Sequence, residues 1–179
     1  MVNSTRLGWH LQRVIGRLLR TGPKPAPPAS TTHHTPVRQA PTAVYPGDFT
    51  GMSTVLYEPI PDASPDPGEI VWTRVVFEED YQRGKDRPVL VIGRDEPWLL
   101  ALMLTSKDHD RDAAVEARHG RVWLDVGTGA WDPQRRPSEI RIDRVLRLDP
   151  AQVRRDGGTL DRARFDLVAD QVRSVDGWS

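Results

Sequence analysis

Apolar residues in the second half of the chain fall into short runs that predict β-strands. The first run, Glu69–Phe77, is rich in β-branched and aromatic residues, and Arg87–Arg94 and Trp98–Leu104 follow it. Because no polar residue interrupts Val89–Ile92, we expect both faces of that strand to be covered. The short turn Gly93–Pro97 predicts that the second and third strands pair as an antiparallel hairpin.

Further along, the pattern predicts two more strands and two helices. The strands are Arg121–Val126 and Ser138–Leu148, and the charged segment Lys107–Gly120 before them is expected to be a loop. Asp149 followed by Pro150 is a helix-start signal, which predicts a helix over Ala151–Arg155. Thr159 begins the last predicted helix, which has an apolar face made of Leu160, Phe165, Val168, Ala169 and Val172.

Together these elements predict a mainly β domain with a C-terminal helix, in the α+β class. Short strands joined by tight turns favour a small, strongly bent sheet or barrel that the helix caps. We place this domain at residues 67–175 and expect residues 48–66 to be an ordered lead-in lying against it.

The N-terminal part of the chain has a different composition. Apolar residues recur at helical spacing within residues 1–20, and arginines lie mostly off that stripe, which predicts a basic amphipathic helix. Such a helix docks on its own domain, frays, or binds a membrane surface or partner protein. Residues 21–47 are rich in Pro and Thr, have too little apolar surface to fold alone, and are expected to form a disordered linker.

Charge and composition narrow the function classes. The formal net charge is zero, but residues 1–40 carry six basic and no acidic side chains, so the remainder has a net charge of −6. A protein that held nucleic acid by bulk charge would be basic, so RNA binding here would need a local basic groove. Cysteine is absent, which excludes disulfides and thiolate metal sites. The sequence has no apolar run of membrane-spanning length and no signal-peptide core, which favours a cytoplasmic protein.

Two adjacent strands carry the candidate chemistry. The second strand begins with Arg87 and Pro88 in the motif Lys-Asp-Arg-Pro, and the third ends in Thr105 and Ser106. Neighbouring strand ends that present a guanidinium and a hydroxyl form a site suited to a phosphate group, because arginine matches two phosphoryl oxygens with a planar fork of donors.

This layout, opened by Pro67-Gly68-Glu69-Ile70-Val71-Trp72, resembles the PemK/MazF family of toxin endoribonucleases over residues 67–172. The resemblance implies an SH3-like barrel, a homodimer, a cognate antitoxin as partner, and cleavage of single-stranded RNA without a metal or other cofactor. In this reaction the 2′-hydroxyl attacks the adjacent phosphate and leaves 2′,3′-cyclic phosphate and 5′-hydroxyl ends. The catalytic arginine of the family corresponds to Arg87 and its catalytic threonine to Thr105.

The resemblance leaves the proton transfers open. Arginine stays protonated in proteins, so Arg87 is expected to stabilise charge. His109 is a candidate acid–base group, because histidine ordinarily changes charge near neutral pH. Many family members have a glutamate where this chain has Gln82, which moves a carboxylate role to Glu79 or Asp80. The expected RNA-binding residues are Lys85, Ser106, Lys107 and Trp131, with Trp131 stacking on a base.

Other readings of the same residues remain open. Arg87 could be an ordinary strand residue paired with Glu78 or Glu79, Thr105 a plain strand terminator, and His109 a solvated loop residue. The acidic run at 108–112 is expected to be a solvated loop, with a hard-metal site as the alternative. The whole domain could also be an inactive or protein-targeting barrel that acts as a nucleic-acid-binding or protein-binding module.

Overall fold

A computed structural model describes residues 44–179, apart from residues 63, 110–112 and 155–156. The expected N-terminal helix at 1–20 and most of the expected linker at 21–47 lie outside the described residues. No helix in the described part of the chain is long and apolar enough to cross a membrane.

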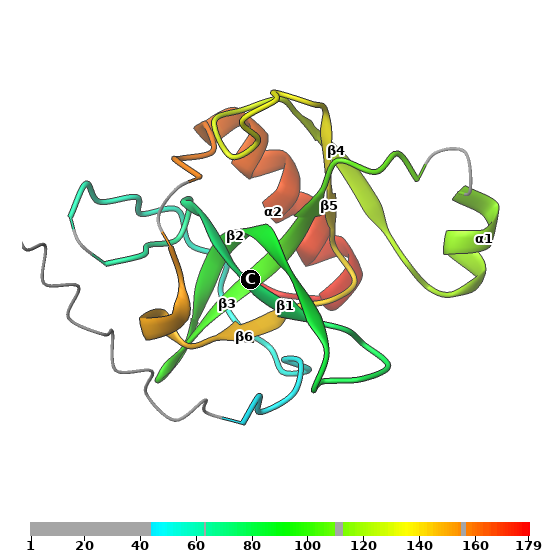
Figure 1. Ribbon diagram of the computed structural model, residues 1–179, viewed down its shortest axis with the longest axis horizontal. Helices are drawn as coiled ribbons and strands as arrows, with labels where there is room; N and C mark the ends of the chain where they lie inside the picture. Colours follow the sequence, from blue (N-terminus) through cyan, green and yellow to red (C-terminus); the bar gives the residue numbers. More distant parts are fainter. Residues whose placement is uncertain (1–43, 63, 110–112, 155–156) are drawn as a thin grey trace, which may run out of the picture. The chain divides into compact units, whose positions relative to one another are not determined.

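An antiparallel sheet of six strands dominates the described residues (Figure 1). The strands are β1 (Ile70–Val76), β2 (Gly84–Asp95), β3 (Trp98–Thr105), β4 (Trp123–Gly127), β5 (Ser138–Arg141) and β6 (Leu146–Leu148). Their order is β1-β2-β3-β5-β4, and β6 pairs with the first half of β3. The prediction of a mainly β domain with a C-terminal helix is therefore confirmed.

The predicted single strand at Ser138–Leu148 is wrong, because it is divided into β5 and β6. Thr105 at the end of β3 pairs with Glu139 of β5, whereas Leu100 near its start pairs with Arg147 of β6. Polar contacts hold the chain between the two strands out of the ladder. Asp143 accepts hydrogen bonds from the Val122 backbone N–H and the Arg141 guanidinium, and the buried Arg144 guanidinium pairs with Asp48.

Both faces of the central strands are covered, as the unbroken apolar run in β2 predicts. Alternate residues such as Leu90 and Leu102 pack in one core cluster with α2 (Arg162–Asp176), which lies behind the sheet in Figure 1. The intervening residues Val89, Val91 and Ala101 belong to a second cluster with residues of β1 and β6. The sheet thus has an apolar layer on each side, which fixes β2 and β3 firmly.

The sheet bends until the segment after β6 meets β1. Trp72 and Arg154 exchange two backbone hydrogen bonds of 2.7 and 2.8 Å, and the Thr73 hydroxyl donates to the Gln152 carbonyl at 3.3 Å. The helix predicted at Ala151–Arg155 is therefore wrong in extent: a single 3₁₀ turn, Pro150–Gln152, forms after the cap residue Asp149. A longer helix is prevented because the backbone N–H and C=O of Arg154 are already hydrogen-bonded to Trp72 of β1.

The last helix begins later than predicted. Thr159 forms an isolated β-bridge with Glu69, and the Leu160 N–H donates to the Gly68 carbonyl at 3.0 Å. Asp161 is the N-cap of α2 and accepts a hydrogen bond from the Arg164 N–H. The lead-in also contacts the domain, because the Leu56 N–H donates to the Ile92 carbonyl at 2.9 Å.

Candidate active site

A small cavity of about 160 Å³ lies where the ends of β2, β3 and β5 meet. It is lined by Trp72, Asp86, Arg87, Pro88, Leu104, Thr105, Ser106, Trp131, Asp132, Arg136 and Ser138. The β2–β3 ladder pairs Val89 with Met103, and extending that register two residues along each strand sets Arg87 opposite Thr105. Strand pairing therefore brings together the guanidinium and the hydroxyl of the expected phosphate site.

Arg87 is half-buried and has no carboxylate partner among the residues the structure describes. Burial lowers the pKa of its guanidinium below the ordinary value, because the charged form is partly desolvated. The alternative pairing with Glu78 is not found, since Glu78 accepts a 2.9 Å hydrogen bond from Arg141 instead. A partly buried positive charge without a protein counter-ion favours the binding of an anion.

Thr105 is buried, and its hydroxyl accepts a 3.2 Å hydrogen bond from the Lys107 backbone N–H. Because a hydroxyl can both accept and donate, this contact leaves its proton available to a group in the cavity. Ser106 also lines the cavity, but its side chain is exposed.

Asp132 and Arg136 were not anticipated, although both line the cavity. The Arg136 Nε–H donates to Oδ2 of the buried Asp132 at 2.7 Å, and the Gln134 backbone N–H donates to Oδ1 at 2.9 Å. The hydrogen bond from Arg136 is the main cause that lowers the pKa of Asp132. The only sequence signal was a polar Asp-Pro turn within a loop, which has no periodicity to set it apart.

The expected stacking of Trp131 on a base is wrong, because only 3% of this residue is exposed. Its indole N–H donates to the Ser138 hydroxyl at 3.1 Å, and the Trp72 indole N–H donates to the Trp131 carbonyl at 3.2 Å. A Cβ atom added at Gly129 would lie 1.9 Å from the Trp131 ring, so the close approach requires glycine. Trp131 therefore anchors the loop that carries Asp132 and Arg136.

His109 is buried, so the reading of a solvated loop histidine is wrong. Its ring Nδ1 lies 2.7 Å from Glu139 Oε2, and its backbone N–H donates to Glu139 Oε1 at 3.0 Å. The ring also stacks on Trp123 at a centroid distance of 3.9 Å. Glu139 is the β5 partner of Thr105, but neither Glu139 nor His109 is one of the residues that line the cavity.

The segment expected to be a loop at Lys107–Gly120 contains a short helix, α1 (Ala113–Arg118), which projects away from the sheet in Figure 1. The Trp123 indole N–H donates to Glu116 Oε2 at 3.0 Å, and Arg121 lies 3.5 Å from the same carboxylate. These contacts lower the pKa of Glu116 and fasten α1 to the strand that supports His109.

The remaining candidates lie outside the cavity. Glu79 is exposed in the β1–β2 turn, beyond the Val76–Gly84 pair, and Gly84 is itself roughly 10 Å along β2 from Arg87. Lys85 and Lys107 are exposed on the chain flanking Arg87 and Thr105. Asp86, by contrast, lines the cavity and is engaged by Arg154 at 2.6 Å.

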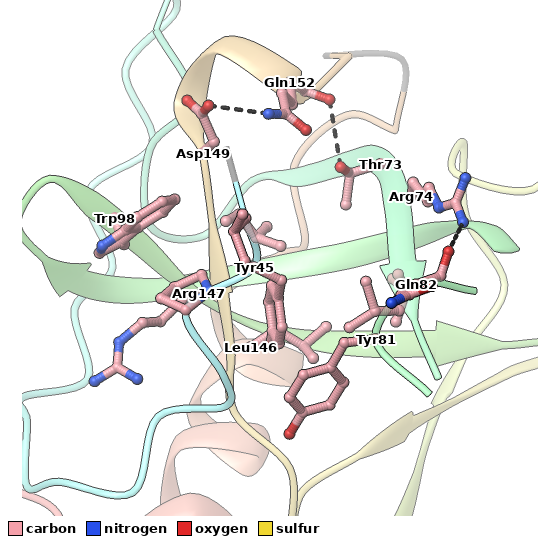
Figure 2. Close-up of a pocket in the computed structure, with 15 residues that line it drawn as sticks. Tyr45, Thr73, Arg74, Tyr81, Gln82, Trp98, Leu146, Arg147, Asp149 and Gln152 are labelled. Atoms are coloured by element: carbon pink, nitrogen blue, oxygen red, sulfur yellow. Dashed lines mark hydrogen bonds between the residues drawn. The ribbon is translucent and has the colours of Figure 1, made fainter. Parts of the chain in front are cut away.

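A larger groove of about 600 Å³ lies away from these residues, over β1, β6 and the lead-in (Figure 2). Tyr45 and Tyr81 meet edge to face at its rim, with a centroid distance of 5.0 Å. Its charged groups have partners within the protein: Arg147 pairs with Asp95, Asp149 caps the 3₁₀ turn, and Arg74 donates to the Gln82 carbonyl at 2.8 Å.

The segment of the chain that contains the cavity matches one known protein family. Residues 66–175 match the family described as PemK-like, MazF-like toxin of type II toxin-antitoxin system. The solved crystal structure of MazE-MazF (Form-II) from Deinococcus radiodurans is 18% identical in sequence, with a TM-score of 0.46, covering 66% of this chain and 100% of that chain. No curated protein matches the chain. The family match spans every residue that lines the cavity.

Proposed function

The chain belongs to the PemK-like, MazF-like toxins of type II toxin–antitoxin systems, and from this premise we propose that it is a metal-independent endoribonuclease acting on single-stranded RNA. One observation carries the proposal. Arg87 is partly buried without a carboxylate partner among the described residues, and it shares a small cavity with the Thr105 hydroxyl. An anionic phosphodiester is the ligand that such a pair would stabilise.

In the proposed reaction the RNA supplies its own nucleophile. The 2′-oxygen bonds to the adjacent phosphorus while the bond from phosphorus to the 5′-oxygen breaks, which gives a 2′,3′-cyclic phosphate and a 5′-hydroxyl. Negative charge accumulates on the non-bridging oxygens in the transition state. Arg87 donates to these oxygens and Thr105 adds a hydroxyl donor, and each such preorganised donor typically contributes about 10²–10³ in rate.

Two proton transfers complete the reaction: one from the 2′-hydroxyl and one to the departing 5′-oxygen. We assign an acid–base role to His109, because the Glu139 carboxylate engages its Nδ1 and so directs Nε2 to proton exchange. Glu79 stays a weaker candidate, because it is exposed in the β1–β2 turn. Ser106 lines the cavity, Lys85 and Lys107 flank it, and all three are proposed to contact the RNA backbone.

Family membership also supports the broader biological proposal. We expect an SH3-like barrel that acts as a cytoplasmic homodimer, and a cognate antitoxin whose tail covers the RNA groove. The net negative charge outside residues 1–40 fits a site that binds RNA locally and not through the whole surface.

The test is incubation of the purified protein with mixed-sequence single-stranded RNA in EDTA, followed by mapping of the cut ends. We expect 5′-hydroxyl ends from the wild-type protein and their loss in Arg87→Ala. Arg83→Ala, which removes an exposed arginine of the β1–β2 turn, is the matched control and should cleave normally. Absence of cuts from folded wild-type protein would overturn the ribonuclease proposal and favour a binding module. Loss of cutting in EDTA alone would overturn the metal-free mechanism.

A further inference from the structure

The cavity contains a second guanidinium that the reaction described above does not use. Arg136 reaches it from the loop between β4 and β5, whereas Arg87 comes from β2. The Arg136 side chain is 55% exposed, so it lies at the rim of the cavity and not in its floor. A polynucleotide that places one phosphate at Arg87 must lead its neighbouring phosphates out past such a rim.

The loop that carries Arg136 is built to a fixed shape. The Asp132 carbonyl accepts a 2.8 Å hydrogen bond from the Arg135 N–H, and the Asp132 side chain accepts another from the Gln134 N–H. Arg135 adopts a φ of 51°, in the left-handed region that residues with a Cβ seldom occupy. Such conformations persist only where the surroundings impose them, and they concentrate at functional sites.

Asp132 controls how Arg136 is presented. A buried carboxylate in a cavity for anions would repel a phosphate unless a cation compensated its charge. Arg136 supplies that charge through Nε alone, and among the described residues no other side chain engages its guanidinium. Its terminal N–H groups therefore remain available to a ligand.

We propose that Arg136 binds the RNA phosphate next to the scissile one and that Asp132 is the positioning residue that orients its guanidinium. This inference rests on the proposed function, because it assumes a phosphodiester at Arg87. It adds a second point of attachment, which fixes the direction in which the strand crosses the site.

The experiment measures the dissociation constant of a fluorescent, uncleavable 2′-O-methyl RNA decamer of random sequence over a range of salt concentrations. In the wild-type protein, log K should fall with log salt, because binding releases counterions from the phosphates. Arg136→Ala should weaken binding about 10-fold or more and reduce the slope by about 0.7, the value for one phosphate of a single strand. Arg136→Lys should restore the slope but not the full affinity, because lysine keeps the charge and loses the fork.

Arg135→Ala removes the adjacent exposed arginine and is the matched control, with an unchanged slope expected. Asp132→Asn separates positioning from simple charge: loss of a negative charge alone would tighten binding, whereas loss of orientation weakens it. Thermal denaturation of each variant confirms that it is folded. An unchanged slope in folded Arg136→Ala overturns the inference, as does tighter binding by Asp132→Asn.

These outcomes are distinguishable from failure of the proposed function. If Arg87→Ala abolishes cleavage and Arg136→Ala keeps the wild-type slope of log K against log salt, the ribonuclease proposal is supported and the second phosphate contact is refuted. If the wild-type protein cuts no RNA but Arg136→Ala loses the slope, the phosphate contact stands in a protein that only binds.

Discussion

The ring Nδ1 of His109 lies 2.7 Å from the Glu139 carboxylate, and both side chains are buried. The same carboxylate also accepts the His109 backbone N–H, so one acidic residue of β5 holds both the ring and the chain that carries it. The ring of this loop histidine is thereby held in a fixed orientation.

Replacement of Glu139 by Gln should therefore affect stability and activity together. The variant loses a charged acceptor at a buried site, and we expect a loss of about 1–3 kcal/mol in the free energy of unfolding. Urea denaturation measures this loss, and RNA cleavage should fall because His109 is no longer oriented. Glu79→Gln is the control, since that exposed side chain should change the unfolding free energy by less than about 0.5 kcal/mol. Equal stability of both variants would contradict the anchoring role.

Arg87→Gln should reduce RNA cleavage without reducing the stability of the fold. Cleavage should fall by about 10²–10³ or more, because the charged donor to the phosphate is lost. The melting temperature should stay level or rise by at most about 2–4 °C, because the native state no longer holds a desolvated, unpaired charge. Differential scanning calorimetry of both proteins checks this, and a marked fall in melting temperature would show that Arg87 has a structural partner.

Acid should destabilise the protein through Asp132 and Glu78. Their hydrogen bonds with Arg136 and Arg141 lower the pKa of each carboxyl below its ordinary value of 3.8 or 4.5. A carboxyl with a depressed folded-state pKa contributes stability above its ordinary pKa, and that contribution is lost as the pH falls through the folded-state pKa. The melting temperature should therefore decline below about pH 4.5, and Asp132→Asn should decline less steeply than wild type. If the melting temperatures of wild type and Asp132→Asn fell equally at acid pH, the Asp132–Arg136 contact would add no pH-dependent stability.

Gly129→Ala should disturb the site from a distance. The new Cβ would overlap the Trp131 ring, so the indole and the loop after it must shift. We expect destabilisation of about 1–3 kcal/mol, as for other overpacked cores, together with reduced cleavage. Tryptophan fluorescence and urea denaturation report the change. Ala130→Gly alters the same loop without adding an atom and should leave the fluorescence as in wild type.

The sequence predicts the central strands well because their signal is local. Val89–Ile92 is apolar at every position, and the structure covers both faces of that strand. Arg87 and Thr105 were predicted as site residues because each flanks an apolar run in the sequence, and both line the cavity. The Ser138–Leu148 segment misled the prediction, because its break depends on contacts of Asp143 and Arg144 with distant residues.

The missed parts of the site share a physical cause. Asp132 and Arg136 lie in an irregular turn, where no periodic pattern marks the residues that face inward. His109 was predicted as an acid–base candidate, but its burial was not, because its neighbours in sequence are charged and its partner Glu139 is thirty residues away. Trp131 looked exposed beside Pro133, yet the contacts that bury it come from β1 and β5. In each case the deciding contacts leave no periodic pattern in the sequence.

The ladder between β2 and β3 ends at Val89 and Met103, and on its other edge β3 pairs with β5 at Leu104 and Thr105. In the sheet β3 therefore separates β1 and β2 from β5 and β4, and the cavity lies just beyond the last pair of β2 and β3. A bound anion that touches both Arg87 and Thr105 would link β2 to β3 beyond the end of their ladder. Occupancy of the site should then slow amide exchange in β4, a strand that contributes no residue to the lining of the cavity.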